Sequence, residues 1–180
     1  MAYPTTIRRR RQHGFTLVEA MITLAIAAIL FAWAVPSLND FIVRNRMSTE
    51  VNYFVASLYL ARSESVKRLQ DVALCPTPNG TVCAASTDWH QGWMVFTDTN
   101  SNDAFENGAD RLLQHNPVLP TRFQITSGRA VIAFQPNGQS GGSNDTFCFR
   151  DTGNVARTRR VTLSNDGRVR TEQLGVGATC

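Results

Sequence analysis

The chain has 180 residues, with 18 Lys+Arg, 14 Asp+Glu, a formal net charge of +4 and a hydrophobic fraction of 43%. This length fits one domain, or one domain with an appendage, and so large an apolar fraction excludes a chain that is disordered throughout. The positive surplus is local, because the four arginines at positions 8–11 account for all of it. Whether those arginines belong to the working protein is the first question that the sequence raises.

Residues 15–35 form an apolar run that contains a single charged residue, Glu19. As a helix this run is about 30 Å long, enough to cross a bilayer core, and the positive-inside rule keeps the preceding arginines cytoplasmic. A secretory signal peptide is the competing interpretation, because Ala32-Trp33-Ala34 offers the small residues of a cleavage site. Glu19 argues against it, since a lone carboxylate there costs roughly 2.5–3.5 kcal/mol and needs a partner.

The residues around Glu19 carry a resemblance to a known family. The motif Gly14-Phe15-Thr16-Leu17-Val18-Glu19, after a short basic leader, resembles the class III signal of type IV pilins and pseudopilins. The resemblance implies that prepilin peptidase removes residues 1–14 by cutting between Gly14 and Phe15, and that the new N-terminal Phe15 is N-methylated. It also implies that Glu19 meets the Phe15 amine of a neighbouring subunit during assembly, which removes an isolated charge from low dielectric.

This resemblance also predicts the cellular location of the protein and its partners. A single-pass prepilin is expected in the inner membrane, and the assembled protein in the pilus, the periplasm and at the cell surface. The expected partners are prepilin peptidase, other major and minor pilins and, before assembly, the inner membrane. Cleavage would remove the four leader arginines and leave a mature chain with no net charge.

The helix is predicted to continue beyond the apolar run to about Gln70. Pro36 should bend or loosen it, because proline lacks an N–H. We therefore expect a transmembrane or filament-core half over residues 15–36 and an amphipathic half over 37–70, which together resemble the long, often kinked helix of pilins. The apolar residues of the extension recur mostly at three- and four-residue steps; they are Leu38, Phe41, Ile42, Val51, Phe54, Val55, Leu58, Val66 and Leu69.

Residues 71–180 have the pattern of a β-rich globular domain, with short apolar runs broken by Gly, Pro, Asn and Asp. Strands are predicted at residues 72–74, 92–97, 111–114, 123–126, 130–134, 146–150, 155–163 and 168–173. Short strands packed on one helix favour an α+β class with antiparallel sheets. The whole arrangement resembles the type IV pilin fold, and residues 60–68 and 89–98 resemble segments of the GspH/FimT family.

The four cysteines, Cys75, Cys83, Cys148 and Cys180, are predicted to form two disulfides. An even count in an exported domain favours disulfides over metal, and the spacing lacks the C-x-x-C pairs of zinc sites. Three connectivities are possible. The turn-rich loop between Cys75 and Cys83 favours that pair, which leaves Cys148 for Cys180.

No catalytic constellation stands out, so neither an enzyme nor a cofactor is predicted. His90 and His115 have no nearby nucleophile, and Ser140 lacks a nucleophile elbow. The acidic segment 98–110 begins like a calcium loop, but Asp103 and Ala109 stand where an EF-hand needs glycine and glutamate. An exposed acidic loop is preferred to a looser calcium loop, and no metal site is predicted.

Charge is unevenly distributed over the globular region, with a net −5 over residues 70–120 and +4 over residues 121–180. Alternating segments on both sides of Asn165-Asp166-Gly167 predict a β-hairpin. A three-residue loop with Gly167 left-handed pairs Leu163 with Val169 and Arg160 with Glu172, which puts the apolar residues on one face. The other face carries Arg160, Arg168 and Arg170, with Arg157 and Arg159 nearby. We interpret these five arginines as a binding patch.

The element Gly167-Arg168-Val169-Arg170 resembles the Gly-Arg-x-Arg element near the C-terminus of FimT-type minor pilins. That resemblance implies DNA binding during natural transformation. Arginines on a rigid hairpin suit phosphates, and few aromatic residues lie beside them, so sequence-independent contact with the DNA backbone is expected. We therefore predict a DNA-binding minor type IV pilin. The alternative is a purely structural minor pilin or a type II secretion pseudopilin, FimU-like or GspH-like, that does not bind DNA.

Overall fold

The computed structural model describes residues 14–154, 157–175 and 180. The chain divides into two compact units, residues 1–43 and residues 44–180, and the helix α1 (Leu17–Arg68) contributes to both. The predicted leader, apart from Gly14, lies outside the described residues. The transmembrane half of the helix was predicted to end at residue 36, and the globular domain to begin after residue 70. Both boundaries stay predictions, because the compact units divide after residue 43 and so mark neither of them.

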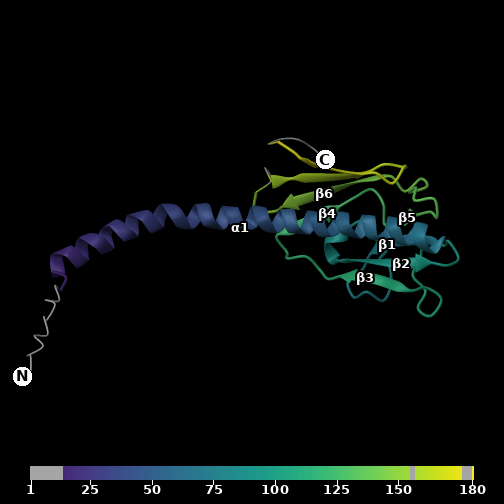
Figure 1. Cartoon of the computed structure of the whole chain (residues 1–180), viewed down its shortest axis with the longest axis horizontal. Helices are drawn as coiled ribbons and strands as arrows, with labels where there is room; N and C mark the ends of the chain where they lie inside the picture. Colours follow the sequence, from purple (N-terminus) through teal and green to yellow (C-terminus); the bar gives the residue numbers. More distant parts are fainter. Residues whose placement is uncertain (1–13, 155–156, 176–179) are drawn as a thin grey trace, which may run out of the picture. The chain divides into compact units, whose positions relative to one another are not determined.

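The first unit consists of the N-terminal part of α1, which begins directly after Thr16 (Figure 1). The Thr16 side-chain oxygen accepts the backbone N–H of Glu19 at 3.2 Å, and the Thr16 carbonyl accepts that of Ala20 at 3.1 Å. Thr16 is therefore the N-cap of α1, with Glu19 at the third helical position. By length and composition α1 contains a stretch that could cross a membrane. The helix continues without a break through position 36.

The C-terminal part of α1 packs on the β-domain through one stripe of residues. Met47, Val51, Phe54, Leu58 and Ala61 recur at three- and four-residue steps and are all buried, as an amphipathic helix requires. The helix ends at Arg68, two residues before the predicted end. It stops there because Leu69 adopts a left-handed φ of 54° and the Gln70 N–H bonds back to the Ser65 carbonyl at 3.3 Å.

In the described residues eight antiparallel strands form two sheets of four, so the predicted α+β class with antiparallel sheets is confirmed. Sheet A has the order β3-β2-β1-β5 and sheet B the order β4-β6-β7-β8. The strands are β1 (Asp71–Pro76), β2 (Trp93–Asp98), β3 (Leu112–Asn116), β4 (Phe123–Thr126), β5 (Ile132–Phe134), β6 (Asp145–Asp151), β7 (Arg159–Leu163) and β8 (Val169–Gln173). A short 3-10 helix, η1 (Trp89–Gln91), precedes β2.

The longest predicted strand is much shorter than expected. The segment predicted over residues 155–163 becomes strand only at Arg159, where pairing with β6 begins opposite Phe149. Residues 155–156 lie outside the described residues, and Arg157 and Thr158 lie outside β7. The position of Arg157 is therefore not set by strand alternation.

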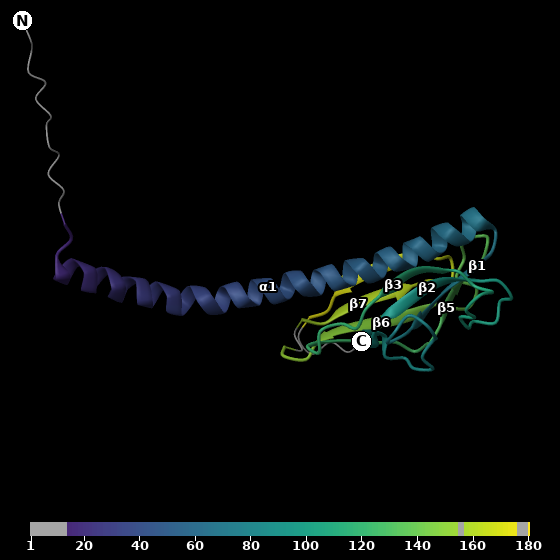
Figure 2. The ribbon, with the colours of Figure 1, turned by 90° about the horizontal axis from the view of Figure 1, so that it is seen from below.

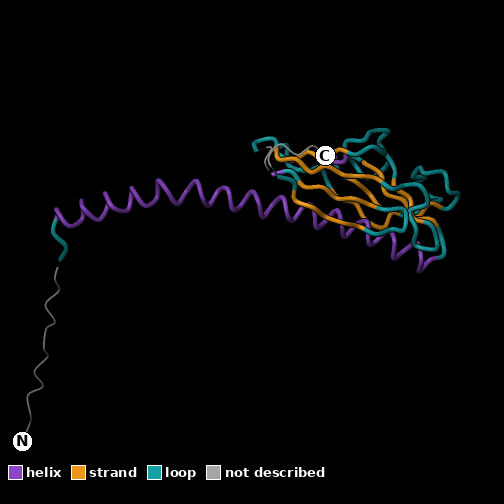
Figure 3. Tube along the Cα trace, turned by 90° about the horizontal axis from the view of Figure 1, so that it is seen from above, coloured by secondary structure: helices purple, strands orange, loops and turns teal. Residues whose placement is uncertain are grey.

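Both sheets pack against the same part of α1, which lies across them in Figures 1 and 2; Figure 3 shows the strands in orange gathered against the purple helix. Phe54 of α1 is the centre of the shared core. Its ring lies 5.5 Å from Trp89, 5.2 Å from Trp93, 4.6 Å from Phe147 and 5.5 Å from Phe149. These aromatic contacts join the helix to both sheets in one hydrophobic core.

Sheet A is also covered on its other face, which explains why β1 and β2 are almost continuously buried. Phe105, from the acidic segment 98–110, stacks edge-on against Phe96 of β2 at 5.4 Å. A disulfide joins Cys75 of β1 to Cys83. A second disulfide joins Cys148 of β6 to Cys180. This is the connectivity that the sequence favours.

Candidate nucleic-acid interface

The β7–β8 hairpin has the register predicted from its alternation. Leu163 lies opposite Val169, Thr162 opposite Arg170, and Arg160 opposite Glu172. Gly167 adopts a left-handed φ of 73°, as the three-residue loop requires. The apolar residues therefore share the face that packs on the core, and the polar residues share the opposite face, the outer face of sheet B.

The hairpin tip is held by two residues from elsewhere in the fold. Arg62 of α1 donates to the Gly167 carbonyl at 2.9 Å and to the Asp166 carbonyl at 3.1 Å. Ser140, which is fully buried, donates its hydroxyl to the Ser164 carbonyl and its N–H to the Asn165 carbonyl, both at 2.9 Å. Four consecutive carbonyls of the turn are thus bound, and the arginines that follow start from a fixed backbone.

Gly167 is required by space as well as by its φ. A Cβ at this position would lie 2.3 Å from the Gly138 carbonyl oxygen and 3.0 Å from the Arg62 Nε. The turn therefore packs directly on the 135–140 loop and on α1, with no room for a side chain. The glycine of the Gly-Arg-x-Arg element is explained by this packing.

The outer face of sheet B gathers arginines from three adjacent strands. Arg160 of β7 lies between Cys148 of β6 and Glu172 of β8 in one cross-strand row. Arg170 lies in the next row, opposite Thr162, and Arg168 precedes β8 at the tip. Arg150 is two residues from Cys148 on β6 and so shares this face. Four arginines, Arg150, Arg160, Arg168 and Arg170, make up this outer arginine face.

Two ion pairs lie on the outer arginine face, and both are accessible to solvent. Arg160 is 3.4 Å from Glu172, and Arg168 is 2.7 Å from Asp166, with 66% of the Arg168 side chain exposed. Within the described part of the chain, the guanidinium groups of Arg150 and Arg170 have no hydrogen-bond or ion-pair partner. Exposed pairs of this kind contribute little to stability because solvent screens them, so an anion can replace the carboxylates readily.

The structure does not bring Arg157 and Arg159 onto the same face as the other three predicted arginines. Arg159 lies opposite Phe149 and Gln173, so it belongs to the inner face of β7, because consecutive strand residues point to opposite sides. Arg157 donates to Asp151 at 3.1 Å, and only 12% of its side chain is exposed. The predicted single patch is therefore two groups of arginines.

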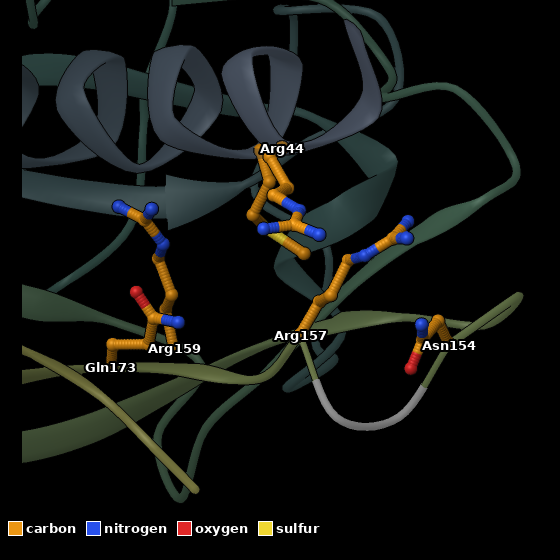
Figure 4. Close-up of a pocket in the computed structure, with 6 residues that line it drawn as sticks. Arg44, Asn154, Arg157, Arg159 and Gln173 are labelled. Atoms are coloured by element: carbon orange, nitrogen blue, oxygen red, sulfur yellow. The ribbon is translucent and has the colours of Figure 1, made fainter. Parts of the chain in front are cut away.

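Arg157 and Arg159 line a pocket of about 320 Å³ beside α1. Figure 4 shows Arg44 reaching from the helix towards the sheet between them, while their side chains rise towards the helix. The six lining residues, Arg44, Met47, Asn154, Arg157, Arg159 and Gln173, are named the arginine pocket.

Asp151 anchors one side of this pocket. Its carboxylate is fully buried and accepts from Arg122 at 2.7 and 3.1 Å, from Arg157 at 3.1 Å and from the Gly153 N–H at 2.9 Å. Burial raises the pKa of Asp151, but the hydrogen bonds from Arg122, Gly153 and Arg157, together with the Arg122 charge, outweigh it, and the net pKa is lowered. Asp151 is therefore ionised at neutral pH.

The predicted processing and assembly residues lie at the beginning of the described chain. Gly14 and Phe15 precede α1, and 80% of Phe15 is exposed. Glu19 is exposed in the first turn, where a carboxylate also interacts favourably with the helix dipole. The helix N-terminus thus offers Glu19 a structural role besides the predicted intersubunit pair.

The acidic segment 98–110 uses its carboxylates to brace its own backbone. Asp98 accepts the N–H groups of Asn102 at 3.1 Å and Asp103 at 2.8 Å, and Asp110 accepts those of Thr99 and Glu106, both at 2.9 Å. The described residues contain no group of three or more His, Cys, Asp or Glu that could hold a metal ion. These hydrogen bonds occupy the carboxylates of Asp98 and Asp110, which are buried and not exposed as expected, and they favour an acidic loop over a calcium loop.

Residues 50–167 match the family described as type II transport protein GspH, over about two thirds of the chain. The chain belongs to the GspH family. Residues 9–35 match the prokaryotic N-terminal methylation motif, a range that contains Gly14, Phe15 and Glu19. The GspH match includes Arg62 and Ser140 but ends at Gly167, so it covers neither Arg168 nor Arg170.

Known relatives of this GspH-family protein are similar at its N-terminus and in its fold. Type IV major fimbrial protein FimA of Dichelobacter nodosus is 51% identical over 41 residues, which cover 23% of this chain and 26% of FimA. The chain thus matches about a quarter of that relative's length. Two crystal structures of the type IV minor pilin FimU from Pseudomonas aeruginosa match with TM-scores of 0.55 and 0.53, at 18% and 19% identity, over 73% and 71% of this chain and 92% and 91% of FimU. This likeness shows the type IV pilin fold.

Three arginines of the GspH-family chain matter to these sites and were not assigned by the sequence. Arg62 lies among the charged residues between the apolar positions of α1, where a local pattern indicates only a solvated charge, and its contact with the hairpin spans 105 positions. Arg150 follows Phe147 and Phe149 in alternation, which signals an outward side chain, but its neighbours become known only from the β6–β7 pairing. Arg44 joins the arginine pocket through helix packing, which no local pattern reveals.

Proposed function

We propose that this GspH-family protein is a minor type IV pilin that assembles into a pilus or at its tip and binds DNA without sequence preference, for uptake in natural transformation. The observation that carries the proposal is the outer arginine face, where Arg150, Arg160 and Arg170 come from three adjacent strands and Arg168 from the hairpin tip. Clustered guanidinium groups present forks of donors that match phosphate oxygens.

The scaffold beneath this face supports binding to a polyanion. Arg62 and Ser140 fix the turn that precedes Arg168 and Arg170, so less conformational entropy is lost when the arginines meet a ligand. Asp166 and Glu172 are only weakly bound to their arginines and can give way to phosphates. The described outer-face residues of β6, β7 and β8 include no aromatic side chain, which favours contact with the backbone over base stacking.

The assembly part of the proposal rests on the N-terminus. The methylation motif over residues 9–35 supports cleavage between Gly14 and Phe15, N-methylation of Phe15 and pairing of Glu19 with a neighbour's Phe15 amine. The exposed apolar surface of the first unit supports insertion in the inner membrane before assembly and packing among other pilins afterwards.

The DNA-binding test uses the detergent-solubilised chain that begins at Phe15, because the leader arginines would bind DNA by themselves. Fluorescence anisotropy with duplex DNA over a range of salt concentrations should show binding with a log–log slope of about −3 to −4, for four phosphate contacts. Replacing Arg168 and Arg170 by Gln should weaken binding about tenfold or more. It should also reduce the magnitude of the salt slope by about 2, because two phosphate contacts are lost.

A charge-matched control is the double variant Arg46→Gln and Arg111→Gln, which removes two exposed positive charges away from the outer arginine face. It should bind nearly as well as the unmodified chain. Absence of binding at low salt, or equal effects of the two double variants, would refute DNA contact through the hairpin. The protein would then be a structural minor pilin or a type II secretion pseudopilin, the class to which the FimU-like fold and the GspH family point.

A further inference from the structure

The arginine pocket is separate from the outer arginine face and has the size of a small-ligand site. Its volume of about 320 Å³ lies at the lower end of the range found for ligand pockets, which is about 300–1,000 Å³. Arg44 and Met47 come from α1, Arg157 and Arg159 from β7 and the residues before it, and Gln173 from β8. Because Arg159 and Arg160 point to opposite faces of β7, the two surfaces are distinct.

The pocket carries an excess of positive charge. Three of its six lining residues are arginines, and none of the six is acidic. The buried Asp151 beside the pocket accepts hydrogen bonds from both Arg157 and Arg122, so it is shared between two guanidinium groups. Within the described part of the chain, the Arg159 guanidinium has no hydrogen-bond or ion-pair partner, although the residue is only partly exposed. Such an arrangement attracts an anion with several acceptor oxygens.

The shape and the charge favour a phosphate monoester over other anions. A monoester carries a charge of about −1.5 to −2 at pH 7, and it ends in three acceptor oxygens that several guanidinium forks can share. An internal phosphodiester carries only one charge and has chain on both sides, which suits an open face better than a pocket. Gln173 and Asn154 add amide groups to the lining, and the buried Met47 provides an apolar wall for an attached sugar or base.

We propose that the arginine pocket binds a phosphate monoester, either a free nucleotide or inorganic phosphate, or the terminal phosphate of a DNA strand. Arg159 is the central donor, with Arg44 and Arg157 completing the positive field around it. This site goes beyond the proposed function, since it uses the inner face of β7 and stands whether or not the outer arginine face binds DNA.

The first test is isothermal titration calorimetry, in which the detergent-solubilised full chain is titrated with deoxyadenosine 5′-monophosphate and with inorganic phosphate. Deoxyadenosine, which lacks the phosphate, and acetate, which is a monoanion, should bind at least tenfold more weakly. Arg159→Gln should weaken monophosphate binding about tenfold or more, since it removes charge-assisted hydrogen bonds. Arg111→Gln, which removes an exposed charge outside both arginine surfaces, should leave it unchanged.

A pH series adds a readout that a nonspecific basic surface would not show. The affinity for the monophosphate should rise several-fold between pH 5 and pH 7.5, as the second proton leaves the phosphate near pH 6. Sulfate, which stays a dianion over this range, should show no such rise. Equal binding of nucleotide and nucleoside, equal binding of acetate, or loss in Arg111→Gln but not in Arg159→Gln would overturn the proposal.

Arg159→Lys keeps the charge without the planar fork and should bind with intermediate affinity, so the proposal stays testable if Arg159→Gln fails to fold.

To identify the source of the phosphate, 5′-phosphorylated and 5′-hydroxyl oligonucleotides are compared with closed circular DNA. A preference for the phosphorylated end that disappears in Arg159→Gln would assign the pocket to DNA termini, and a monophosphate bound without that preference would assign it to free ligands. Circular DNA bound without monophosphate binding refutes the pocket alone, and the reverse result refutes only the outer arginine face.

Discussion

Asp151 is the residue on which the inner group of arginines depends. Its buried carboxylate holds Arg122 and Arg157 together with the Gly153 N–H at the end of β6. A buried charge that loses its partner is costly, while a buried charge with several hydrogen bonds is well tolerated. Removing this one carboxylate therefore takes a hydrogen-bonded ionic partner away from both Arg122 and Arg157.

We expect Asp151→Asn to lower the free energy of unfolding by about 3 kcal/mol at pH 7, because it breaks a buried pair. Because the pKa of Asp151 in the folded protein lies below its ordinary value of 3.8, the stabilisation is present above that value and is lost as the pH falls through the lowered pKa. The difference between the two proteins should therefore shrink below pH 4. Chemical denaturation at pH 7 and pH 3 measures both effects.

Asp103→Asn is the matched control for this substitution. Asp103 is exposed as a residue, but partial desolvation of its carboxylate, together with the charges of Asp98 and Asp71, raises its pKa, so its negative charge does not stabilise the fold. Its left-handed φ of 60° suits asparagine equally well. The control should stay within about 0.5 kcal/mol of the unmodified protein. Equal effects of the two substitutions would contradict the role assigned to Asp151.

At the scale of elements, the β7–β8 hairpin is tied to the rest of the domain through its turn. Arg62 of α1 and Ser140 of the 135–140 loop bind its carbonyls, and Gly167 packs directly on Gly138. The hairpin arginines are thus held in place by contacts with segments far away in sequence. Substitutions in the turn should affect both stability and DNA binding.

We expect Gly167→Ala to lower the free energy of unfolding by about 2 kcal/mol, because a Cβ would clash with the Gly138 carbonyl and the φ of 73° disfavours alanine. DNA affinity should fall as well, since the turn must shift. Gly175→Ala is the control, because nothing lies within 4 Å of a Cβ there. Urea denaturation and anisotropy titration measure the two effects, and an unchanged Gly167→Ala protein would show that the turn tolerates displacement.

At the scale of the whole molecule, the two halves of the globular domain carry opposite charge. The acidic residues 70–120 form most of sheet A and the loop that covers it, and the basic residues 121–180 form all of sheet B. Without residues 1–14, the proposed leader, the chain has no net charge, yet it can still steer a polyanion when its charges are separated in this way. The proposed assembly involves instead the N-terminus, where Glu19 is the only charge in the apolar run.

Two roles of Glu19 can be separated by substitution. If its negative charge pairs with the Phe15 amine of a neighbouring subunit, both Glu19→Ala and Glu19→Gln should reduce incorporation into pili severely, because neither carries the charge. If Glu19 serves only the capped N-terminus of α1, glutamine should function nearly as well as glutamate. Immunoblotting of sheared pili measures incorporation, and normal incorporation of Glu19→Gln would refute the pairing role.

Local patterns predicted most of the elements correctly. All eight strands, the antiparallel α+β class and the hairpin register follow from side-chain alternation and turn residues, which act over a few positions. The helix ends at Arg68, close to the predicted end near Gln70, and no local pattern signals this end because Leu69 adopts a left-handed conformation that favours glycine. The strand before Leu163 was too long because Arg157 is held by Asp151 and not by a neighbouring strand.

The sequence by itself determined the elements, the N-terminal processing motif and the arginines of the Gly-Arg-x-Arg element, since each is encoded by residues close together in the chain. Only the tertiary structure decided which arginines act together. It added Arg150 to the outer face through the pairing of β6 with β7, and it moved Arg157 and Arg159 to a separate pocket beside α1. The reason is physical. Strand alternation predicts that neighbouring side chains point to opposite faces of a sheet, but what packs against each face depends on contacts between segments far apart in the chain.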